Sequence, residues 1–308
     1  MALTDDQLRH YQDHGFVIAD GLLTPDDLQP AIEEIEAHVG ALADALHDAG
    51  RIPETYAELG FFERLAAVER AYGTAAVMFH MSGLLGRGIA SLWGSPKLLA
   101  IVEQLIGPDI AGHPVCNVRS KTPQTELMTV PWHQDTAYLL AGAEGTHQPA
   151  AWIPFLDVTV ETGCMQVKRG AHKAGVFGHK IERDVANPKS WYLYIPEPDL
   201  ADYETVTCEM ALGSVLFINQ MVPHRSLENL SDKVRWSVDL RWQRPDQPSG
   251  WDGFLDPFVM RRGDDPAFRP DWDDFFARRA KAFEGFRNLD ESSFDISVEG
   301  PWIERWRQ

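Results

Sequence analysis

The sequence predicts a mostly β fold, a sandwich or jelly roll, with helices on both sides of it along the chain. Between residues 108 and 245 the apolar runs are short, rich in β-forming residues and bounded by turn residues, which is typical of such folds. Before residue 107 apolar residues recur with helical spacing instead. The expected strands are 113–119, 126–132, 150–157, 164–168, 205–209, 214–219 and 234–243.

Helix start signals are clear near the N-terminus. Thr4 followed by Gln7 is a capping-box pattern, and Thr24 followed by Pro25 pairs a cap residue with a proline suited to the first turn. A short strand over 16–18 should separate these two helices. The expected helices are 4–13, 24–50, several within 61–106, and 271–286.

We expect residues 1–308 to form a single catalytic domain. Its parts are a helix-rich segment over 1–107, a jelly-roll core over 108–245 and a C-terminal extension over 246–308. The extension should serve as a lid or as an oligomer contact, so a homodimer is one expectation. Residues 169–203 should form a long loop, and loops of that length usually have a role such as covering a site.

The composition excludes several kinds of partner. The net charge is −18 and the pI about 4.9, whereas binding to nucleic acid or to an anionic membrane requires a cationic surface. The same acidity weakly favours a neutral or cationic substrate.

Cysteine usage and the N-terminus indicate the cytoplasm. The three cysteines, Cys116, Cys164 and Cys208, are far apart and form no CxxC pair, which argues against a disulfide framework or a thiolate zinc site. The first residues are polar and acidic, unlike a signal peptide. No apolar run reaches the roughly 18 residues needed to span a membrane.

The most informative local motif is Pro131-Trp132-His133-Gln134-Asp135. On a strand, residues i and i+2 point to the same face, so His133 and Asp135 are expected to present an imidazole and a carboxylate side by side. His224 follows an apolar strand and a turn at Pro223 and supplies a third donor. Two histidines and one carboxylate form the facial triad of non-haem Fe(II) oxygenases, which leaves metal positions open for reactants.

Arg235 lies eleven residues after His224, within a strand-like run. A metal site that chelates a dicarboxylate needs a fixed cation for the far carboxylate. Arginine suits this role because its planar fork binds carboxylates bidentately and stays charged. The order His-x-Asp, distant His, then Arg is more specific than any of its parts.

These segments together resemble the phytanoyl-CoA dioxygenase family of Fe(II)/2-oxoglutarate oxygenases. The similarity runs from residue 3 to about 262 and is carried by LTDDQLRHYQDHGFVIADGLLTPDDL, PWHQD, AAWIPFLDVTVETGCMQVKRGAHK, and GSVLF leading to His224-Arg225-Ser226. The resemblance implies a double-stranded β-helix, the cupin-like jelly roll, with flanking helices. It implies three cofactors or co-substrates: Fe(II), 2-oxoglutarate and O2.

The resemblance also assigns roles to residues of this chain. His133, Asp135 and His224 would be the Fe ligands, and Arg235 would pair with the distal carboxylate of 2-oxoglutarate. Further contacts to co-substrate or substrate would come from Ser226, Trp152, Asn117, Arg119 and Lys121. The reaction would oxidise a substrate C–H bond and release succinate and CO2. Related halogenases have a small residue in place of Asp135, so the carboxylate argues for hydroxylation or a related oxidation.

Two other functions fit parts of the pattern. Two histidines and one carboxylate would also suit a zinc-dependent hydrolase or isomerase, although such an enzyme has no use for Arg235. A non-catalytic small-molecule-binding protein on the same barrel is the other alternative. The substrate is expected to be a small molecule such as a specialised metabolite or an amino-acid derivative.

Overall fold

The computed structural model describes residues 2–125, 128–140, 142–183, 191–251, 256–282 and 303–306. Its helices are α1 (Asp5–His14), α2 (Pro25–Asp48), α3 (Arg64–Ala71), α4 (Ala75–Met81), α5 (Arg87–Trp93), α6 (Pro96–Ile106), α7 (Trp272–Ala282) and α8 (Ile303–Trp306). Its strands are β1 (Phe16–Ala19), β2 (Ile110–Gly112), β3 (Asn117–Lys121), β4 (Ala150–Pro154), β5 (Met165–Lys168), β6 (Lys180–Arg183), β7 (Trp191–Tyr194), β8 (Thr205–Cys208), β9 (Val215–Ile218), β10 (His224–Ser226), β11 (Arg235–Gln243) and β12 (Phe258–Arg261).

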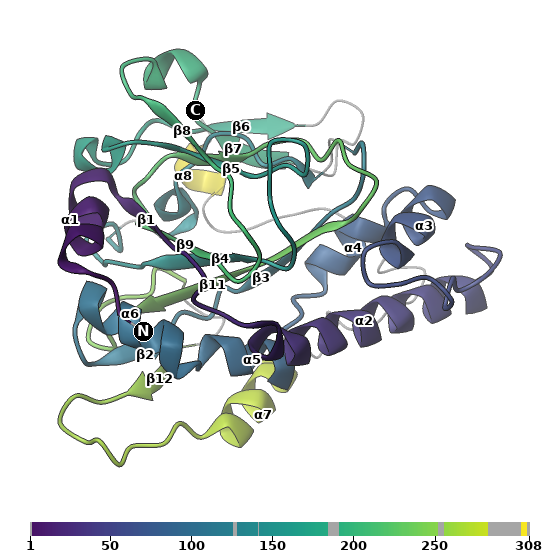
Figure 1. Ribbon diagram of the computed structural model, residues 1–308, viewed down its shortest axis with the longest axis horizontal. Coiled ribbons are helices and arrows are strands. Elements are labelled where there is room, and N and C mark those ends of the chain that lie inside the picture. The colour runs from purple at the N-terminus through teal and green to yellow at the C-terminus, as the bar shows by residue number, and fades with distance from the viewer. Residues whose placement is uncertain are drawn as a thin grey trace.

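The strands form a large sheet that faces smaller ones, as expected of a jelly roll. The large sheet has the order β1-β9-β4-β11-β2-β12, and β3 also pairs with β11. The small sheets have the order β10-β5-β8 and β6-β7. Figure 1 shows strands β1, β9, β4 and β11 of the large sheet between the small sheets on one side and α2, α5 and α6 on the other. All strand pairs in these sheets are antiparallel, which confirms the predicted mostly β architecture.

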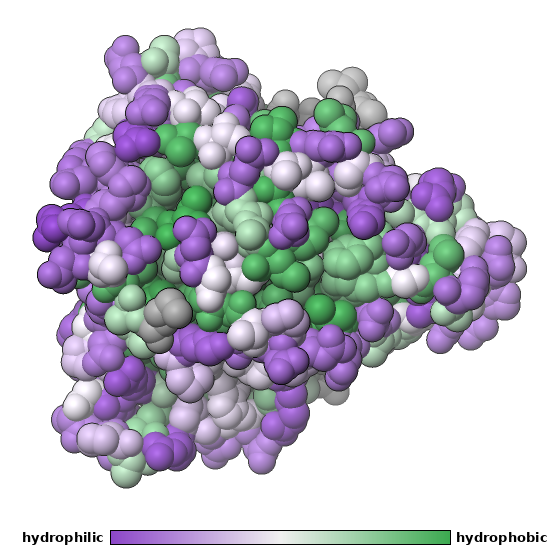
Figure 2. All heavy atoms as spheres, viewed as in Figure 1, coloured by the Kyte–Doolittle hydropathy of each residue, from purple (hydrophilic) through white to green (hydrophobic). Residues whose placement is uncertain are grey.

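Two hydrophobic clusters hold these layers together. The larger one joins the helices to the outer face of the large sheet and includes Leu28 and Ile35 of α2 with Trp236 and Val238 of β11. The second lies between the sheets and includes Met165 and Leu216. On the surface seen in Figure 2, hydrophilic side chains dominate the rim, and hydrophobic ones gather across the middle of the face. The pocket described below opens on the inner side of the large sheet.

The predicted helix starts are confirmed. Thr4 and Thr24 both cap their helices in capping boxes, Thr4 with the Gln7 side chain and Thr24 with that of Asp27. Gly15 ends α1 in the left-handed region with φ of 84°, a conformation that favours glycine. The expected helix over 271–286 is present as α7, and its predicted end lies outside the described residues.

Two predicted strands were wrong in extent, and a proline explains each. Of the strand expected over 113–119, only 117–119 are strand, as the first part of β3; β2 ends earlier, at Gly112, and Pro114 lies in the irregular stretch between the two. Residues 128–132, the described part of the strand expected over 126–132, are not a regular strand. Pro131 has no N–H to donate to a neighbouring strand, so pairing there is reduced to isolated contacts such as Ser226 N–H to the Val130 carbonyl at 3.1 Å.

The segment 169–203 is more structured than the predicted loop. It contains β6 and β7, which pair antiparallel, and two short 3-10 turns. Within the described ranges, no helix is long and apolar enough to cross a membrane.

Candidate active site

Strand pairing between two distant segments brings the predicted metal ligands together. β10 pairs with β5, and His224 at its start also forms an antiparallel bridge with His133. The backbone N–H of His133 donates to the His224 carbonyl at 3.0 Å, and the reverse bond is 2.9 Å long. This exchange places the two imidazole rings with their centroids 4.2 Å apart, and both residues are buried.

The two imidazoles are oriented in the same way by their own backbone. His133 Nδ1 lies 2.8 Å from the Pro131 carbonyl, and His224 Nδ1 lies 2.9 Å from the Val222 carbonyl. A carbonyl only accepts, so each Nδ1 carries the proton and each Nε2 keeps its lone pair for a metal. Burial, with a further contribution from His224, holds the pKa of His133 well below its ordinary value, so this ring is neutral near pH 7.

Asp135 completes the group by a different route from the one expected. It does not continue a strand with His133 but begins a 3-10 turn over Asp135–Tyr138. Its Oδ1 nevertheless lies 3.9 Å from Nε2 of each histidine. The three ligand atoms lie within 4.8 Å of one another, and no other group of this kind occurs in the described part of the chain. The prediction of a shared strand face was therefore wrong, whereas the predicted juxtaposition is present.

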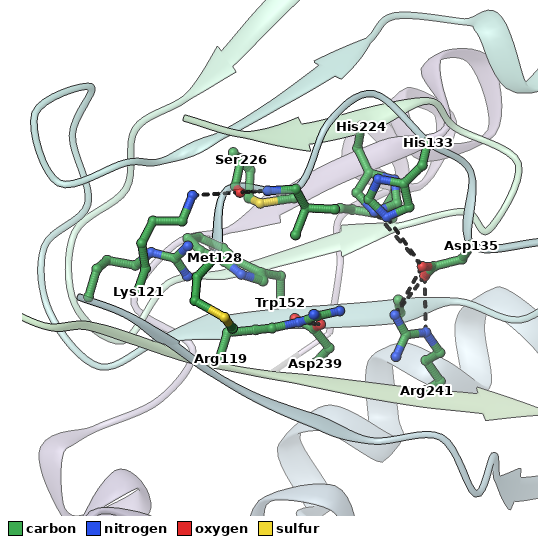
Figure 3. A pocket seen from close by; sticks show the side chains of 15 residues that line it. Arg119, Lys121, Met128, His133, Asp135, Trp152, His224, Ser226, Asp239 and Arg241 are labelled. Atoms are coloured by element: carbon green, nitrogen blue, oxygen red, sulfur yellow. Dashed lines mark hydrogen bonds and ion pairs between the residues drawn. The ribbon is translucent and has the colours of Figure 1, made fainter. Parts of the chain in front are cut away.

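Arg241 holds the Asp135 carboxylate from the side away from the histidines. Its Nε donates to Oδ2 and its Nη2 to Oδ1, both at 3.0 Å, which is a bidentate ion pair (Figure 3). Burial alone would raise the pKa of Asp135, but Arg241 and, to a smaller extent, the two histidines keep it far below its ordinary value. The carboxylate is thus ionised and fixed in orientation before any metal binds.

The other end of the pocket contains two buried cations. The Lys121 ammonium donates to Ser226 Oγ at 2.7 Å and to the Leu227 carbonyl. The Arg235 guanidinium lies over the Trp152 ring, 5.3 Å from its centroid, and donates through Nη1 to Ser237 Oγ at 2.6 Å. Arg235 Nε is buried without a hydrogen-bond partner in the described structure.

The Lys121 and Arg235 end of the pocket is suited to an anion. Burial, followed by repulsion from Arg235, lowers the pKa of Lys121 well below its usual range. Burial also lowers the pKa of Arg235 to about 10. Two desolvated cations with an unsatisfied donor create a site that a carboxylate would complete, because it would restore charge balance and accept the free hydrogen bonds.

The alternation along β11 and β3 decides which side chains face this pocket. Trp236, Val238, Leu240 and Trp242 join the core on the helix side, so the residues between them face inward. Pairing sets Lys121 opposite Arg235 and Asn117 opposite Asp239. Asn117 lies on the same strand as Lys121 but is not among the residues that line the pocket, so its predicted role gains no support from the geometry.

Two charged residues in this pocket were not singled out as an ion pair from the sequence. Arg119 Nε donates to Asp239 Oδ2 at 2.9 Å, and its Nη1 lies 3.4 Å from His80 Nε2. Burial, with Arg119 nearby, lowers the pKa of His80 to about 4, so a neutral imidazole supports the guanidinium from behind. Figure 3 shows Arg119 and Asp239 between the Lys121 end and the metal triad.

Gln134, between His133 and Asp135 in sequence, forms its side-chain hydrogen bonds with backbone groups outside the triad. Its side chain donates to the Gly175 and Met221 carbonyls at 2.8 and 2.6 Å and accepts the Phe177 N–H at 2.8 Å. It thereby ties the segment after β5 to the loop before His224. The role of this residue is to fix the backbone that carries the triad.

A jelly roll with two histidines and one carboxylate at one end of a cationic pocket defines a class of metal-dependent proteins. A family model for phytanoyl-CoA dioxygenase (PhyH) matches residues 11–237. The chain belongs to this family, as the sequence resemblance predicts.

Comparisons with individual proteins agree with this family assignment. The chain is 25% identical over 244 residues to 1-deoxypentalenic acid 11-beta-hydroxylase of Streptomyces arenae, a match that covers 76% of this chain and 79% of the relative. Its fold is similar to that of the non-heme monooxygenase ThoJ, with a TM-score of 0.60 at 21% identity, covering 91% of this chain and 98% of that one. It is also similar to the α-ketoglutarate-dependent carbocyclase SnoK from nogalamycin biosynthesis, with a TM-score of 0.52 at 21% identity over 79% of this chain and 85% of that one. These likenesses confirm the fold.

Proposed function

We propose that this protein is an Fe(II)- and 2-oxoglutarate-dependent oxygenase that hydroxylates a C–H bond of a small organic molecule and releases succinate and CO2. One observation carries the proposal: a single pocket holds a preformed two-histidine, one-carboxylate triad at one end and two buried cations, Lys121 and Arg235, at the other. The family and the named hydroxylase relative support it.

The donor set suits Fe(II). Two imidazole Nε2 atoms and one carboxylate oxygen are the facial triad of this class of iron enzymes, and within the described residues the cluster contains no cysteine that would favour a structural zinc. Bound Fe(II) with 2-oxoglutarate and O2 supplies the oxidising power for a C–H bond. Asp135 supplies a carboxylate where halogenases of this type have a small residue, which supports hydroxylation.

The chain's own residues would bind and orient the co-substrate. Lys121, Ser226 and Arg235 would hold the distal carboxylate of 2-oxoglutarate, since together they offer a hydroxyl and two cations with few other partners. Trp152 would flank the co-substrate, because its ring packs under Arg235 and lines the pocket. Met128, Met165 and Ile218 supply apolar walls that exclude water.

The first test uses the charge-transfer band that 2-oxoglutarate gives on chelating Fe(II) without oxygen. We expect this band in the wild-type protein, and we expect Arg235→Ala to need roughly 10- to 100-fold more 2-oxoglutarate for half-saturation, because a charge-assisted bidentate contact is lost. Arg225→Ala is a matched control: Arg225 stacks on Trp132 and does not line the pocket, so the titration should be unchanged. A wild-type protein that gives no band and prefers zinc would support the hydrolase alternative instead.

We also propose that residues 303–306 of the C-terminal extension pack on their own domain and are not primarily an oligomer contact. Trp306 Nε1 donates to the Ala137 carbonyl at 2.9 Å, and Arg305 Nη1 donates to the Leu139 carbonyl at 3.0 Å. The Trp306 ring also packs on His179, with centroids 4.9 Å apart. These contacts support the turn that starts at Asp135.

Trp306→Ala should therefore destabilise the protein without changing its oligomeric state. We expect a loss of about 1–3 kcal/mol in the free energy of unfolding, from a partly buried hydrogen bond and an aromatic contact. Denaturant unfolding measures the loss, and light scattering after size exclusion measures the mass. A shift from dimer to monomer in this variant would show that the extension is an interface after all.

All three cysteines are buried and unpaired. Free thiols of this kind persist in reducing compartments, which supports the proposal that the protein works in the cytoplasm.

A further inference from the structure

We infer that the substrate carries a carboxylate and that Arg119 binds it, an inference that rests on the proposed oxygenase function and names the substrate class. The charge of the pocket is the first argument. Its lining contains four cations, Arg119, Lys121, Arg235 and Arg241, and two carboxylates, Asp135 and Asp239. Counted with every lysine and arginine protonated, the pocket has an excess of two positive charges, although the whole chain has a net charge of −18.

The co-substrate does not remove this excess. Fe(II) adds two positive charges and 2-oxoglutarate adds two negative ones, while histidine ligands are neutral. The loaded site therefore keeps an excess of two positive charges in a largely buried environment, where uncompensated charge is energetically unfavourable. A substrate with an anionic group reduces that excess, and a cationic substrate would increase it. The pocket thus argues against the neutral or cationic substrate that the overall acidity weakly favours.

Arg119 is the cation best placed for a second anion. Lys121 and Arg235 are occupied by the proposed co-substrate, and Arg241 is held bidentate by Asp135. Arg119 engages its Nε with Asp239 and its Nη1 with His80, and its Nη2 has no hydrogen-bond partner among the described residues. Its side chain is 22% exposed, against 9% for that of Arg241.

The position of Arg119 suits substrate anchoring. It extends from β3 between the Lys121 end and the triad, with Asp239 beside it (Figure 3). Asp239 and His80 fix the guanidinium at Nε and Nη1, so the remaining N–H groups are oriented before a ligand arrives. A carboxylate bound there would hold the substrate beside the metal at a fixed distance, which selects one C–H bond for oxidation.

The test compares acids with their primary amides, which match in shape but lack the charge. Calorimetric titration of the Fe(II)- and 2-oxoglutarate-loaded protein without oxygen would use 1-deoxypentalenic acid, cyclohexanecarboxylic acid and decanoic acid, each beside its amide. We expect at least one acid to bind tenfold or more tightly than its amide. The 2-oxoglutarate band, recorded on the same samples, tests the proposed function separately.

Two variants assign the preference to Arg119. The double variant Arg119→Gln/Asp239→Asn removes the anchor without leaving a buried carboxylate unpaired and without changing the net charge of the pocket. It should lose the preference for acid over amide, while Arg119→Lys should keep part of it. If no acid binds more tightly than its amide, or if the preference survives in the double variant, the inference is wrong. It is equally wrong if the double variant loses the 2-oxoglutarate band, because Arg119 would then serve the co-substrate.

Discussion

His224→Ala is expected to lose tightly bound iron and the 2-oxoglutarate charge-transfer band. The imidazole supplies one of three donors, and its Nε2 is aimed at the metal position by the Nδ1 contact with the Val222 carbonyl. Loss of an outer-shell partner typically lowers metal affinity 10- to 100-fold, and loss of a direct ligand should exceed this, with a decrease of roughly 1,000-fold or more. Metal analysis after anaerobic Fe(II) loading and desalting measures how much iron the variant retains.

His133→Ala should behave in the same way, because the two histidines hold equivalent positions across the backbone bridge. His47→Ala is the matched control: this histidine lies on α2 with its side chain 46% exposed and should not affect iron content. If either triad variant retained iron and the band, the metal would have to bind elsewhere. Activity that persisted without oxygen in the wild type would point to a hydrolase.

The sequence predicts a cluster of His133, Asp135 and His224, and the structure brings these three residues together even though part of the reasoning about them is wrong. His133, Asp135 and His224 could be chosen because few residue types bind iron and their order is characteristic. The shared strand face is absent, since Asp135 opens a 3-10 turn. The three residues come together although the predicted backbone conformation at Asp135 was wrong, because the backbone bridge between His133 and His224 positions the donors.

The charged residues of the pocket wall were harder to identify. The alternation Arg235, Ser237, Asp239 and Arg241 is visible in the sequence as one face of β11. All nine residues of this strand are buried, so neither face is marked by solvent exposure. The partners are also remote along the chain: Arg119 precedes Asp239 by 120 residues, and Asp135 precedes Arg241 by 106. Such pairs follow from strand register, which one sequence does not specify.

Arg241→Gln is the second change with a large expected effect. The variant leaves the Asp135 carboxylate buried without its cation, and breaking a buried ion pair from one side typically costs about 3–5 kcal/mol. We therefore expect the free energy of unfolding of the metal-free protein to fall by about this amount. Arg244→Gln is the control, because Arg244 forms an exposed pair with Asp246 and its loss should change stability very little.

Iron should change the size of this effect. A bound Fe(II) provides Asp135 with a second positive partner, so saturating metal under nitrogen should restore a large part of the stability that Arg241→Gln loses. The difference between the metal-free and metal-loaded losses, from denaturant unfolding, measures how far Arg241 acts through Asp135. Arg241 Nη1 also donates to the Val115 carbonyl at 3.3 Å, so a purely structural role is the competing explanation. Equal losses with and without iron would favour that role, whereas a loss confined largely to the metal-free protein identifies Arg241 as the residue that keeps the metal-binding carboxylate ionised and in place.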